Sequence, residues 1–246
     1  MAHTKPNLII AGCQKSGTTW LHSALGKSPL VYASQVKELN FFNKPNFQER
    51  EEEYRQNFPV TEGVKYYLES TPHYFQRPQG SVDIAGNIKS HLGDPKIIVI
   101  FRNPMDRYES AYIHHMMKKR IPYQRDITEM TDDNKMLSLG NYADILPHWQ
   151  ETFPQMGVFF YDDLTAAPEV FVETVSRFLG IEGSIHPEDV AFRTNDKHRK
   201  ASSLGAEWDE MPAMSEDLRS RLKAYYADGI ERLSKMTGRD LSAWME

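Results

Sequence analysis

The sequence is poor in cysteine. Its 246 residues contain a single one, Cys13, so the chain cannot form an internal disulfide, and nothing in the cysteine content indicates an oxidising compartment. The nine histidines are scattered without the spacing of metal ligands, and the adjacent His114 and His115 would face different ways on a helix. The sequence therefore predicts neither a disulfide-stapled fold nor a metal site.

The sequence also lacks long apolar segments. No run of 18 apolar residues occurs, and the N-terminal MAHTKPNLII has no charged region followed by a long apolar stretch. We therefore expect no membrane span, and either a cytoplasmic protein or a catalytic domain cut from a longer one.

Positive charge is in short supply. There are 29 Lys and Arg residues against 34 Asp and Glu, which gives a net charge of −5. Because nucleic-acid-binding proteins usually present a basic face, this balance argues against nucleic acid as a partner. An anionic ligand would have to be held by local lysines and arginines. The sequence carries no signal of oligomeric state.

What the sequence does contain is an alternation of strand-like and helix-like segments. Apolar, strand-like runs occur at residues 8–11, 64–68, 96–101 and 157–161, and helical patterns at residues 18–27, 81–92, 105–119, 142–153 and 168–179. This alternation predicts an α/β fold with a central parallel sheet flanked by helices. Because no repeat or Gly/Ser linker divides the chain, we expect a single domain over residues 1–246. Residues 120–140 are charged and lack a period, which favours a mobile loop.

Residues 8–20, LIIAGCQKSGTTW, join the first apolar run to the first helical pattern through a short polar loop. A buried strand that turns directly into a helix leaves backbone N–H groups at the positive end of the helix dipole, where an anion fits. Gly12 and Gly17 have the spacing of G-x-x-x-x-G-K-[ST], but Thr18 replaces the lysine, which lies inside the loop as Lys15. We interpret the loop as suited to one terminal 5′-phosphate group rather than to ATP hydrolysis. In the simpler alternative, the Gly-Thr-Thr turn only caps a helix.

The stretch QKSGTTWL resembles the 5′-phosphosulfate loop of the sulfotransferases that use 3′-phosphoadenosine 5′-phosphosulfate (PAPS). The resemblance implies an α/β domain with a P-loop-like phosphosulfate-binding loop, PAPS as cofactor, and no metal ion. The residues that it implies for cofactor binding in this loop are Lys15, Ser16, Gly17, Thr18, Thr19 and Trp20. Lys15 would also act catalytically, by offsetting charge on the bridging oxygen of the leaving group. Trp20 resembles the family tryptophan that stacks on adenine, with a core role as the alternative.

A second motif of the family is matched by IIVIFRNPMDRYESAY, residues 97–112. Here an arginine follows an apolar strand directly, and a proline is placed to start a helix that carries a serine two turns in. In the family this arginine and serine bind the 3′-phosphate of PAPS, which implies that role for Arg102 and Ser110. Alternatively, Arg102 pairs with Asp106 at the start of the helix, although Arg107 is the better surface candidate.

A third segment, QVKELNFF at residues 35–42, resembles the K-E-x-x-F-F element of the carbohydrate, heparan-type branch of the family. In that branch the glutamate is proposed to be the general base, which implies this role for Glu38, with Lys37 as a neighbour that holds Glu38 or the cofactor. In the simpler alternative, Lys37 and Glu38 are a solvated pair ahead of Phe41 and Phe42 in the core.

The fourth segment, YLESTPHYF at residues 67–75, resembles the E-K-[ST]-P-x-Y-F stretch of the same branch. It has Ser70 where that branch has a lysine. His73 is a second candidate for the base, because other branches of the family use histidine. We rank His73 behind Glu38.

A weaker match is RTNDKHRKAS, residues 193–202, where the family has a basic loop over the cofactor, often with R-K-G. Arg199 and Lys200 fit this pattern and become candidate cofactor-binding residues, while Ala201 replaces the glycine. A basic surface turn is the alternative.

Together these matches imply a sulfotransferase that moves the sulfuryl group of PAPS to a hydroxyl of a carbohydrate or small-molecule acceptor, by in-line attack with a general base. The K-E-x-x-F-F element favours a sugar hydroxyl. An acidic chain lacks the basic groove expected for long sulfated polysaccharides, so a small glycan and a small alcohol both stay open. Two alternatives from other classes are a small-molecule kinase with a degenerate phosphate loop and a non-catalytic nucleotide-binding scaffold.

Overall fold

The computed structural model describes residues 2–192 and 208–246 of the chain. They divide into two compact units: unit 1 within Met1–Phe101 and Ile145–Phe192, and unit 2 within Arg102–Asp144 and Arg193–Glu246. The expectation of one domain over residues 1–246 stays a prediction.

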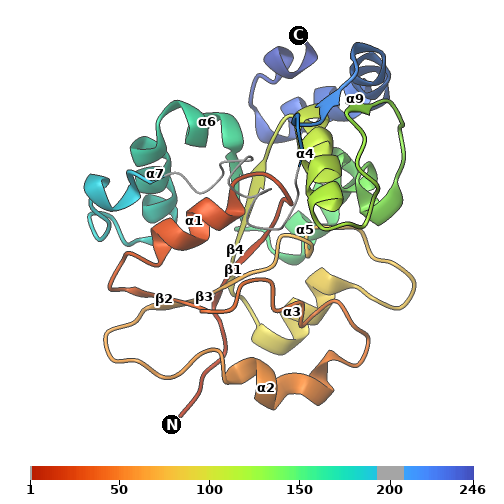
Figure 1. The fold of residues 1–246 in the computed structure, drawn as a ribbon. Helices are drawn as coiled ribbons and strands as arrows, with labels where there is room; N and C mark the ends of the chain where they lie inside the picture. The colour runs from red at the N-terminus through yellow and green to blue at the C-terminus, as the bar shows by residue number, and fades with distance from the viewer. Residues whose placement is uncertain (1, 193–207) are drawn as a thin grey trace. The chain divides into compact units, whose positions relative to one another are not determined.

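A parallel sheet forms the centre of unit 1 (Figure 1). Its strands in the described part of the chain are β1 (Leu8–Gly12), β2 (Val31–Ala33), β3 (Tyr66–Ser70), β4 (Lys96–Phe101) and β6 (Gly157–Phe160), in the order β2-β3-β1-β4-β6. Each neighbouring pair is parallel. Every residue of β1 is buried, because this strand is central and helices cover both of its faces. The predicted α/β fold with a central parallel sheet is confirmed.

The helices of unit 1 pack on the two faces of this sheet. They are α1 (Thr18–Leu25), α2 (Glu51–Arg55), α3 (Ile84–Leu92), α6 (Tyr161–Ala166) and α7 (Pro168–Leu179), together with most of α5 (Tyr142–Thr152). Figure 1 shows α1 and α7 on one side of the strands and α3 on the other. Leu21 of α1 and Val175 of α7 share a buried apolar cluster with Ile10 of β1. Burial of the apolar faces of these helices is what holds the strand ends and their loops in place.

Unit 2 is built around α4 (Pro104–Met117) and α9 (Glu216–Thr237). Helix α9 was not predicted from the sequence, although its buried residues Leu218, Leu222, Tyr226 and Ile230 recur at helical spacing. Its start is also marked in the sequence, because the side chain of Ser215 accepts a hydrogen bond from the Leu218 N–H and caps the helix.

Residues 120–140 of unit 2 contain more structure than the mobile loop that we expected. They include β5 (Asp126–Ile127), which pairs with β7 (Ala213–Met214), and two 3-10 turns, Asp133–Lys135 and Ser138–Gly140. The hydroxyl of Tyr108 on α4 donates to the Glu129 carbonyl at 3.0 Å and accepts from the Thr131 N–H at 2.9 Å. These contacts could not be predicted from the sequence, because they join the Tyr108 side chain to main-chain atoms about 20 residues further along the chain.

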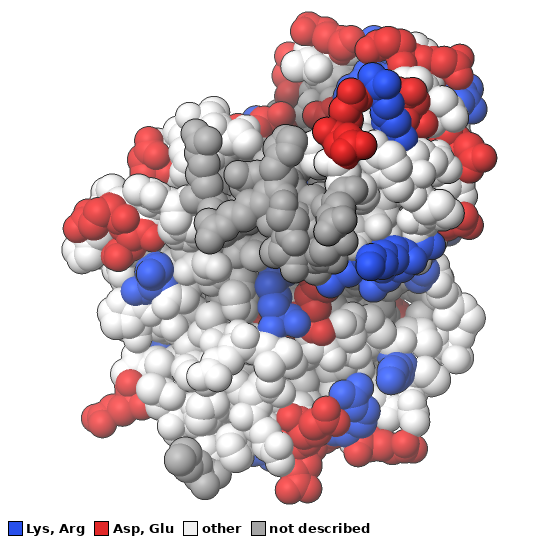
Figure 2. Space-filling view, viewed as in Figure 1, with Lys and Arg blue, Asp and Glu red and all other residues white. Residues whose placement is uncertain are grey.

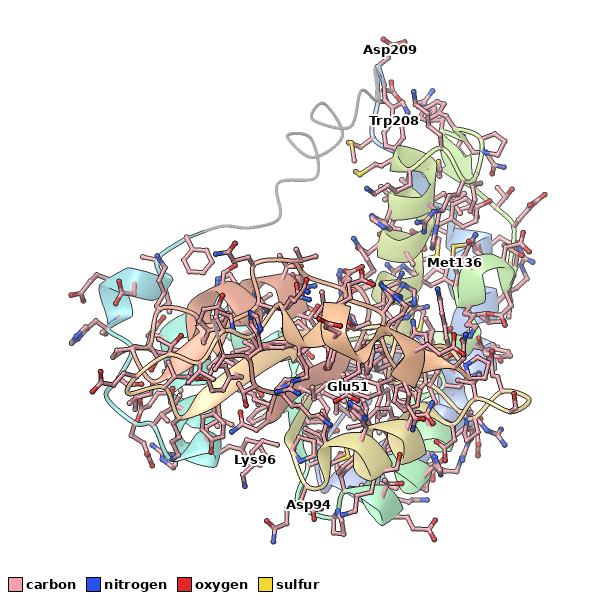
Figure 3. All side chains as sticks on the ribbon, turned by 90° about the horizontal axis from the view of Figure 1, so that it is seen from below. Glu51, Asp94, Lys96, Met136, Trp208 and Asp209 are labelled. Carbon is pink, nitrogen blue, oxygen red and sulfur yellow. The ribbon has the colours of Figure 1, made fainter. Side chains whose placement is uncertain are left out.

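On the face shown in Figure 2, Lys and Arg side chains form separate groups among acidic ones rather than one continuous basic surface. Figure 3 labels Glu51, at the start of α2, and Asp94, which belong to two exposed ion pairs. Glu51 pairs with Lys5 at 3.0 Å, and Asp94 pairs with Lys89. Exposed pairs of this kind contribute little to stability. Within the described residues, no helix has the length and hydropathy needed to cross a membrane.

Candidate functional site

The polar loop between β1 and α1 is the centre of the candidate site in unit 1. The Cys13 N–H donates to the Ile100 carbonyl of β4 at 3.1 Å, and the Ser16 N–H donates to the Cys13 carbonyl at 3.2 Å, which closes the loop into a tight turn. Helix α1 then begins at Thr18, with Gly17 as its N-cap residue and without a side-chain cap in the described structure. The simpler alternative, in which a threonine side chain caps α1, is therefore not what the structure shows. The first turn of α1 has the form of an anion site.

Gly17 meets two separate requirements of this turn. Its φ of +84° is in the left-handed region, which residues with a side chain disfavour. A Cβ at this position would also lie 2.5 Å from Cδ2 of Leu164 on α6 and 3.1 Å from the ring of Tyr161. Gly17 is thus required both by backbone conformation and by the close approach of α6.

We expect Gly17→Ala to destabilise the protein more than Gly63→Ala does. Gly63 has a similar φ of +77°, but a Cβ added there would have no neighbour within 4 Å, so its substitution reports the conformational cost, about 1–2 kcal/mol. Gly17→Ala should cost about 1–3 kcal/mol more, because Leu164 has to move. Urea unfolding of the two variants measures both costs. An equal loss of unfolding free energy in the two variants would show that Leu164 on α6 moves without an energetic cost. Packing against α6 would then not be a requirement at Gly17.

The segment that contains Glu38 runs along the carboxyl end of β3. The Ser34 N–H donates to the Leu68 carbonyl at 3.0 Å, and the Glu38 N–H donates to the Ser70 carbonyl at 2.9 Å. Since β3 is the neighbour of β1, this places the main chain of Glu38 at the same edge of the sheet as the phosphate loop.

The Glu38 side chain is 49% exposed, and its carboxylate lies 3.4 Å from Nζ of Lys37, which is 19% exposed. Phe41 and Phe42 are buried. The pair thus has the form of the simpler alternative, a partly solvated ion pair ahead of two core phenylalanines. The role of Glu38 as base stays a prediction.

His73 lies beside the phosphate loop. The turn after β3 is fixed to the end of β1 by hydrogen bonds from the Thr71 N–H to the Ile10 carbonyl and from the Phe75 N–H to the Ala11 carbonyl. Nε2 of His73 is 3.0 Å from Nε2 of Gln14 in the loop. With the Gln14 amide as donor, the lone pair of this ring nitrogen is engaged. No role for Gln14 was predicted from the sequence, and its place next to Lys15 in the loop motif was the available signal.

His22 and Ser70 form a further pair that the sequence analysis missed. Nδ1 of His22 is 2.7 Å from the hydroxyl of Ser70, and its Nε2 is 3.2 Å from the Ser34 carbonyl. Burial, followed by the nearby charge of Lys37, lowers the pKa of His22 to about 4, against the opposing effect of the hydrogen bond to Ser34. A neutral imidazole therefore donates to the Ser34 carbonyl and accepts from Ser70. The residue that replaces the family lysine is thus used to hold α1 against β3.

Trp20 is packed in the core of unit 1. It is 6% exposed, its ring stacks on Phe192 at 5.6 Å between centroids, and its N–H donates to the Phe192 carbonyl at 3.2 Å. The structure therefore shows the core role that the sequence left open. Stacking of adenine on Trp20 stays a prediction.

The residues predicted to bind the 3′-phosphate belong to unit 2. Arg102 directly follows β4, and Ser110 lies two turns into α4 with a partly exposed side chain. The side chain of Asp106, which the alternative paired with Arg102, accepts a hydrogen bond from Arg219 of α9 at 2.9 Å. The sequence favoured a surface position for Arg107, and this prediction is wrong. Arg107 is fully buried and donates a hydrogen bond to the Met136 carbonyl. Its position on the inner face of α4 decides this.

Arg199 and Lys200 lie outside the described residues, so their predicted contact with the cofactor stays a prediction. The structure thus groups Lys15, Ser16, Gly17, Thr18, Thr19, Glu38 and His73 at one edge of the unit 1 sheet, and places Arg102 and Ser110 in unit 2.

A family model described as the sulfotransferase domain matches residues 5–202 of the chain. The chain belongs to the sulfotransferase family. The predicted family is confirmed, and the match includes every candidate site residue named from the sequence.

Heparan sulfate enzymes are among the relatives of this sulfotransferase. It is 28% identical over 274 aligned residues to the bifunctional heparan sulfate N-deacetylase/N-sulfotransferase 1 of Mus musculus, and 27% identical to that of Homo sapiens. Each alignment covers 98% of this chain but 31% of the relative, so the chain spans about a third of the length of these relatives.

A solved structure supports the fold of this sulfotransferase. The crystal structure of a sulfotransferase from Alicyclobacillus acidocaldarius matches with a TM-score of 0.76 at 24% identity, over 99% of this chain and 100% of that one. A sulfotransferase domain from the curacin biosynthetic pathway matches with a TM-score of 0.56 at 14% identity, over 92% of this chain and 99% of that one. At these identities the similarity shows a shared fold.

Proposed function

We propose that this sulfotransferase moves the sulfuryl group of PAPS to a hydroxyl of a carbohydrate or small-molecule acceptor. The observation that carries the proposal is the tight turn from Gly12 to Thr18, which presents Lys15 and the uncapped start of α1 at the carboxyl edge of a parallel sheet. Backbone N–H groups, a lysine and threonine hydroxyls there suit the phosphosulfate end of the cofactor.

In the proposed reaction, the acceptor oxygen attacks sulfur in line with the bond from sulfur to the 5′-phosphate oxygen. As the new S–O bond forms and the old one breaks, the acceptor proton passes to the carboxylate of Glu38, and adenosine 3′,5′-bisphosphate leaves. Lys15 and the first turn of α1 offset the charge that builds on the bridging oxygen. We assign the 3′-phosphate to Arg102 and Ser110, with Arg199 and Lys200 as further cofactor contacts.

Adenosine 3′,5′-bisphosphate is expected to raise the melting temperature, and adenosine 5′-phosphate to raise it much less, because the second ligand lacks the group that Arg102 and Ser110 would bind. At 100 times its dissociation constant a ligand stabilises the folded state by about 2.7 kcal/mol, which corresponds to roughly 5–10 °C in a chain of this size. EDTA should leave both shifts unchanged. Equal shifts with the two nucleotides would contradict the assignment of the 3′-phosphate to Arg102 and Ser110.

The acceptor is best identified by transfer of radiolabelled sulfate from PAPS to a panel of sugars and small alcohols. The relatives are named for N-sulfotransfer on heparan sulfate, so the panel should pair an amino sugar with its N-acetylated form. Labelling of both sugars would support a hydroxyl group as the acceptor. Labelling of the amino sugar alone would show that the acceptor is the amino nitrogen. Binding of the nucleotide with no labelled product would favour the non-catalytic scaffold. The cytoplasmic location stays a prediction.

A further inference from the structure

A carboxylate with no role in the proposed chemistry lies in the core next to the candidate site. Glu69, in β3, is fully buried. Its Oε1 accepts hydrogen bonds from the hydroxyls of Thr71 at 2.9 Å and Tyr74 at 2.6 Å, and its Oε2 accepts one from the hydroxyl of Tyr54. Burial raises the pKa of Glu69, against these three hydrogen bonds, which lower it. An acidic group is costly to bury, and here its lone pairs are used by three donors.

Two of these three hydroxyls also bind the main chain just after Glu38. The Tyr74 hydroxyl accepts from the Phe41 N–H at 2.9 Å and from the Phe42 N–H at 3.3 Å, and the Thr71 hydroxyl accepts from the Asn40 N–H at 3.4 Å. Each hydroxyl has one proton. Because each hydroxyl uses that proton to donate a hydrogen bond to Glu69, its oxygen lone pairs accept the hydrogen bonds from the amides.

The main chain held in this way is in a conformation that needs support. Glu38 and Asn40 have φ values of +64° and +52°, in the left-handed region, which residues with a side chain disfavour and asparagine tolerates better than glutamate. The Glu38 N–H donates to the Ser70 carbonyl, so four amides between residues 38 and 42 bind to residues 70–74. Local strain of this kind persists where surrounding structure fixes it.

We propose that Glu69 is a positioning residue, which acts through Tyr74 and Thr71 to hold the main chain of residues 38–42 and thereby the Glu38 carboxylate. The link to catalysis rests on the proposed role of Glu38 as base. The link from Glu69 to the main chain is independent of that role, because it consists of hydrogen bonds within unit 1.

Tyr74→Phe and Tyr54→Phe form a matched pair for the test. Each removes one buried hydroxyl that donates to Glu69, but the Tyr54 hydroxyl binds the opposite carboxylate oxygen, whereas the Tyr74 hydroxyl also binds the Phe41 and Phe42 amides. We expect Tyr74→Phe to lower kcat at least about 10-fold, with the KM for PAPS changed less than about 2-fold, since the base moves and the cofactor loop does not. Tyr54→Phe should change kcat less than about 3-fold.

Amide hydrogen exchange without substrate tests the main-chain part directly. The Phe41 and Phe42 amides should exchange at least about 10-fold faster in Tyr74→Phe than in Tyr54→Phe. If Tyr74→Phe does not fold, Thr71→Val tests the same link at the Asn40 amide. Unchanged exchange in the variants that fold, or an equal loss of kcat in the Tyr54 and Tyr74 variants, would overturn the positioning role.

A double variant separates this inference from the proposed function. If the network acts through the base, Tyr74→Phe should have no further effect on kcat in a Glu38→Gln background. A full additional loss in that background would overturn action through Glu38. If Glu38→Gln alone keeps normal turnover, the proposed base is wrong, while faster exchange at Phe41 and Phe42 in Tyr74→Phe would still support the link from the Glu69 network to the main chain through the Tyr74 hydroxyl.

Discussion

Glu38→Gln is expected to transfer sulfate at least about 100-fold more slowly than the unchanged protein while binding adenosine 3′,5′-bisphosphate normally. Removal of a general base typically costs about 10²–10⁴-fold in rate, because the acceptor proton no longer has a place to go as the S–O bond forms. Glutamine keeps the shape of the side chain, and the main-chain hydrogen bond from residue 38 to the Ser70 carbonyl is unaffected. Single-turnover kinetics with labelled PAPS, beside a nucleotide titration, measure the two effects separately.

His73→Asn is the comparison for this variant. His73 reaches the phosphate loop through Gln14, and a bond donated by Gln14 to its Nε2 uses the lone pair that a base needs. We therefore expect His73→Asn to lose far less turnover than Glu38→Gln. The reverse ranking would make His73 the base and weaken the link to the heparan-type branch, without affecting membership of the sulfotransferase family.

Lys15→Ala is the second change with a large expected effect. At saturating PAPS, kcat should fall about 30- to 1,000-fold. This corresponds to a loss of roughly 2–4 kcal/mol of transition-state stabilisation, because a charge-assisted contact to the leaving oxygen is lost. The φ of Lys15 is +69°, and alanine retains the Cβ, so the backbone strain of the loop is nearly unchanged. Lys15→Ala thus tests the charge and not the conformation.

Arg102→Ala is the matched control for charge. A contact to the 3′-phosphate stays the same in the ground and transition states, so its loss should weaken PAPS binding by about 2–4 kcal/mol with a much smaller change in kcat. Initial rates over a range of PAPS concentrations separate the two patterns. Near-normal turnover of Lys15→Ala at saturating PAPS would place the phosphosulfate site elsewhere in the chain.

The sequence determined four strands of the sheet, β1, β3, β4 and β6, and the position of the loop, but the edge strand β2 was not predicted. The apolar runs that became β1 and β4 are continuous because both faces of a central parallel strand are buried, so their pattern could be recognised without a structure. Gly12 and Gly17 marked the ends of the phosphate loop: Gly17 has a left-handed φ, and a Cβ added at Gly12 would lie 2.5 Å from Cβ of Phe75. The match of family motifs then indicated the activity.

The tertiary structure alone decided how the residues of the site are held. Gln14 and His73, His22 and Ser70, and Tyr54 and Glu69 are pairs whose members lie on different segments of the chain. No periodicity in the sequence predicts such pairs, because a hydrogen bond between two side chains depends on which elements lie next to each other in the folded protein. The same holds for Arg107, whose charge suggested the surface and whose buried position was decided by the inner face of α4 and the Met136 carbonyl. Local pattern fixes an element, whereas the partners of a polar side chain are fixed by packing between elements.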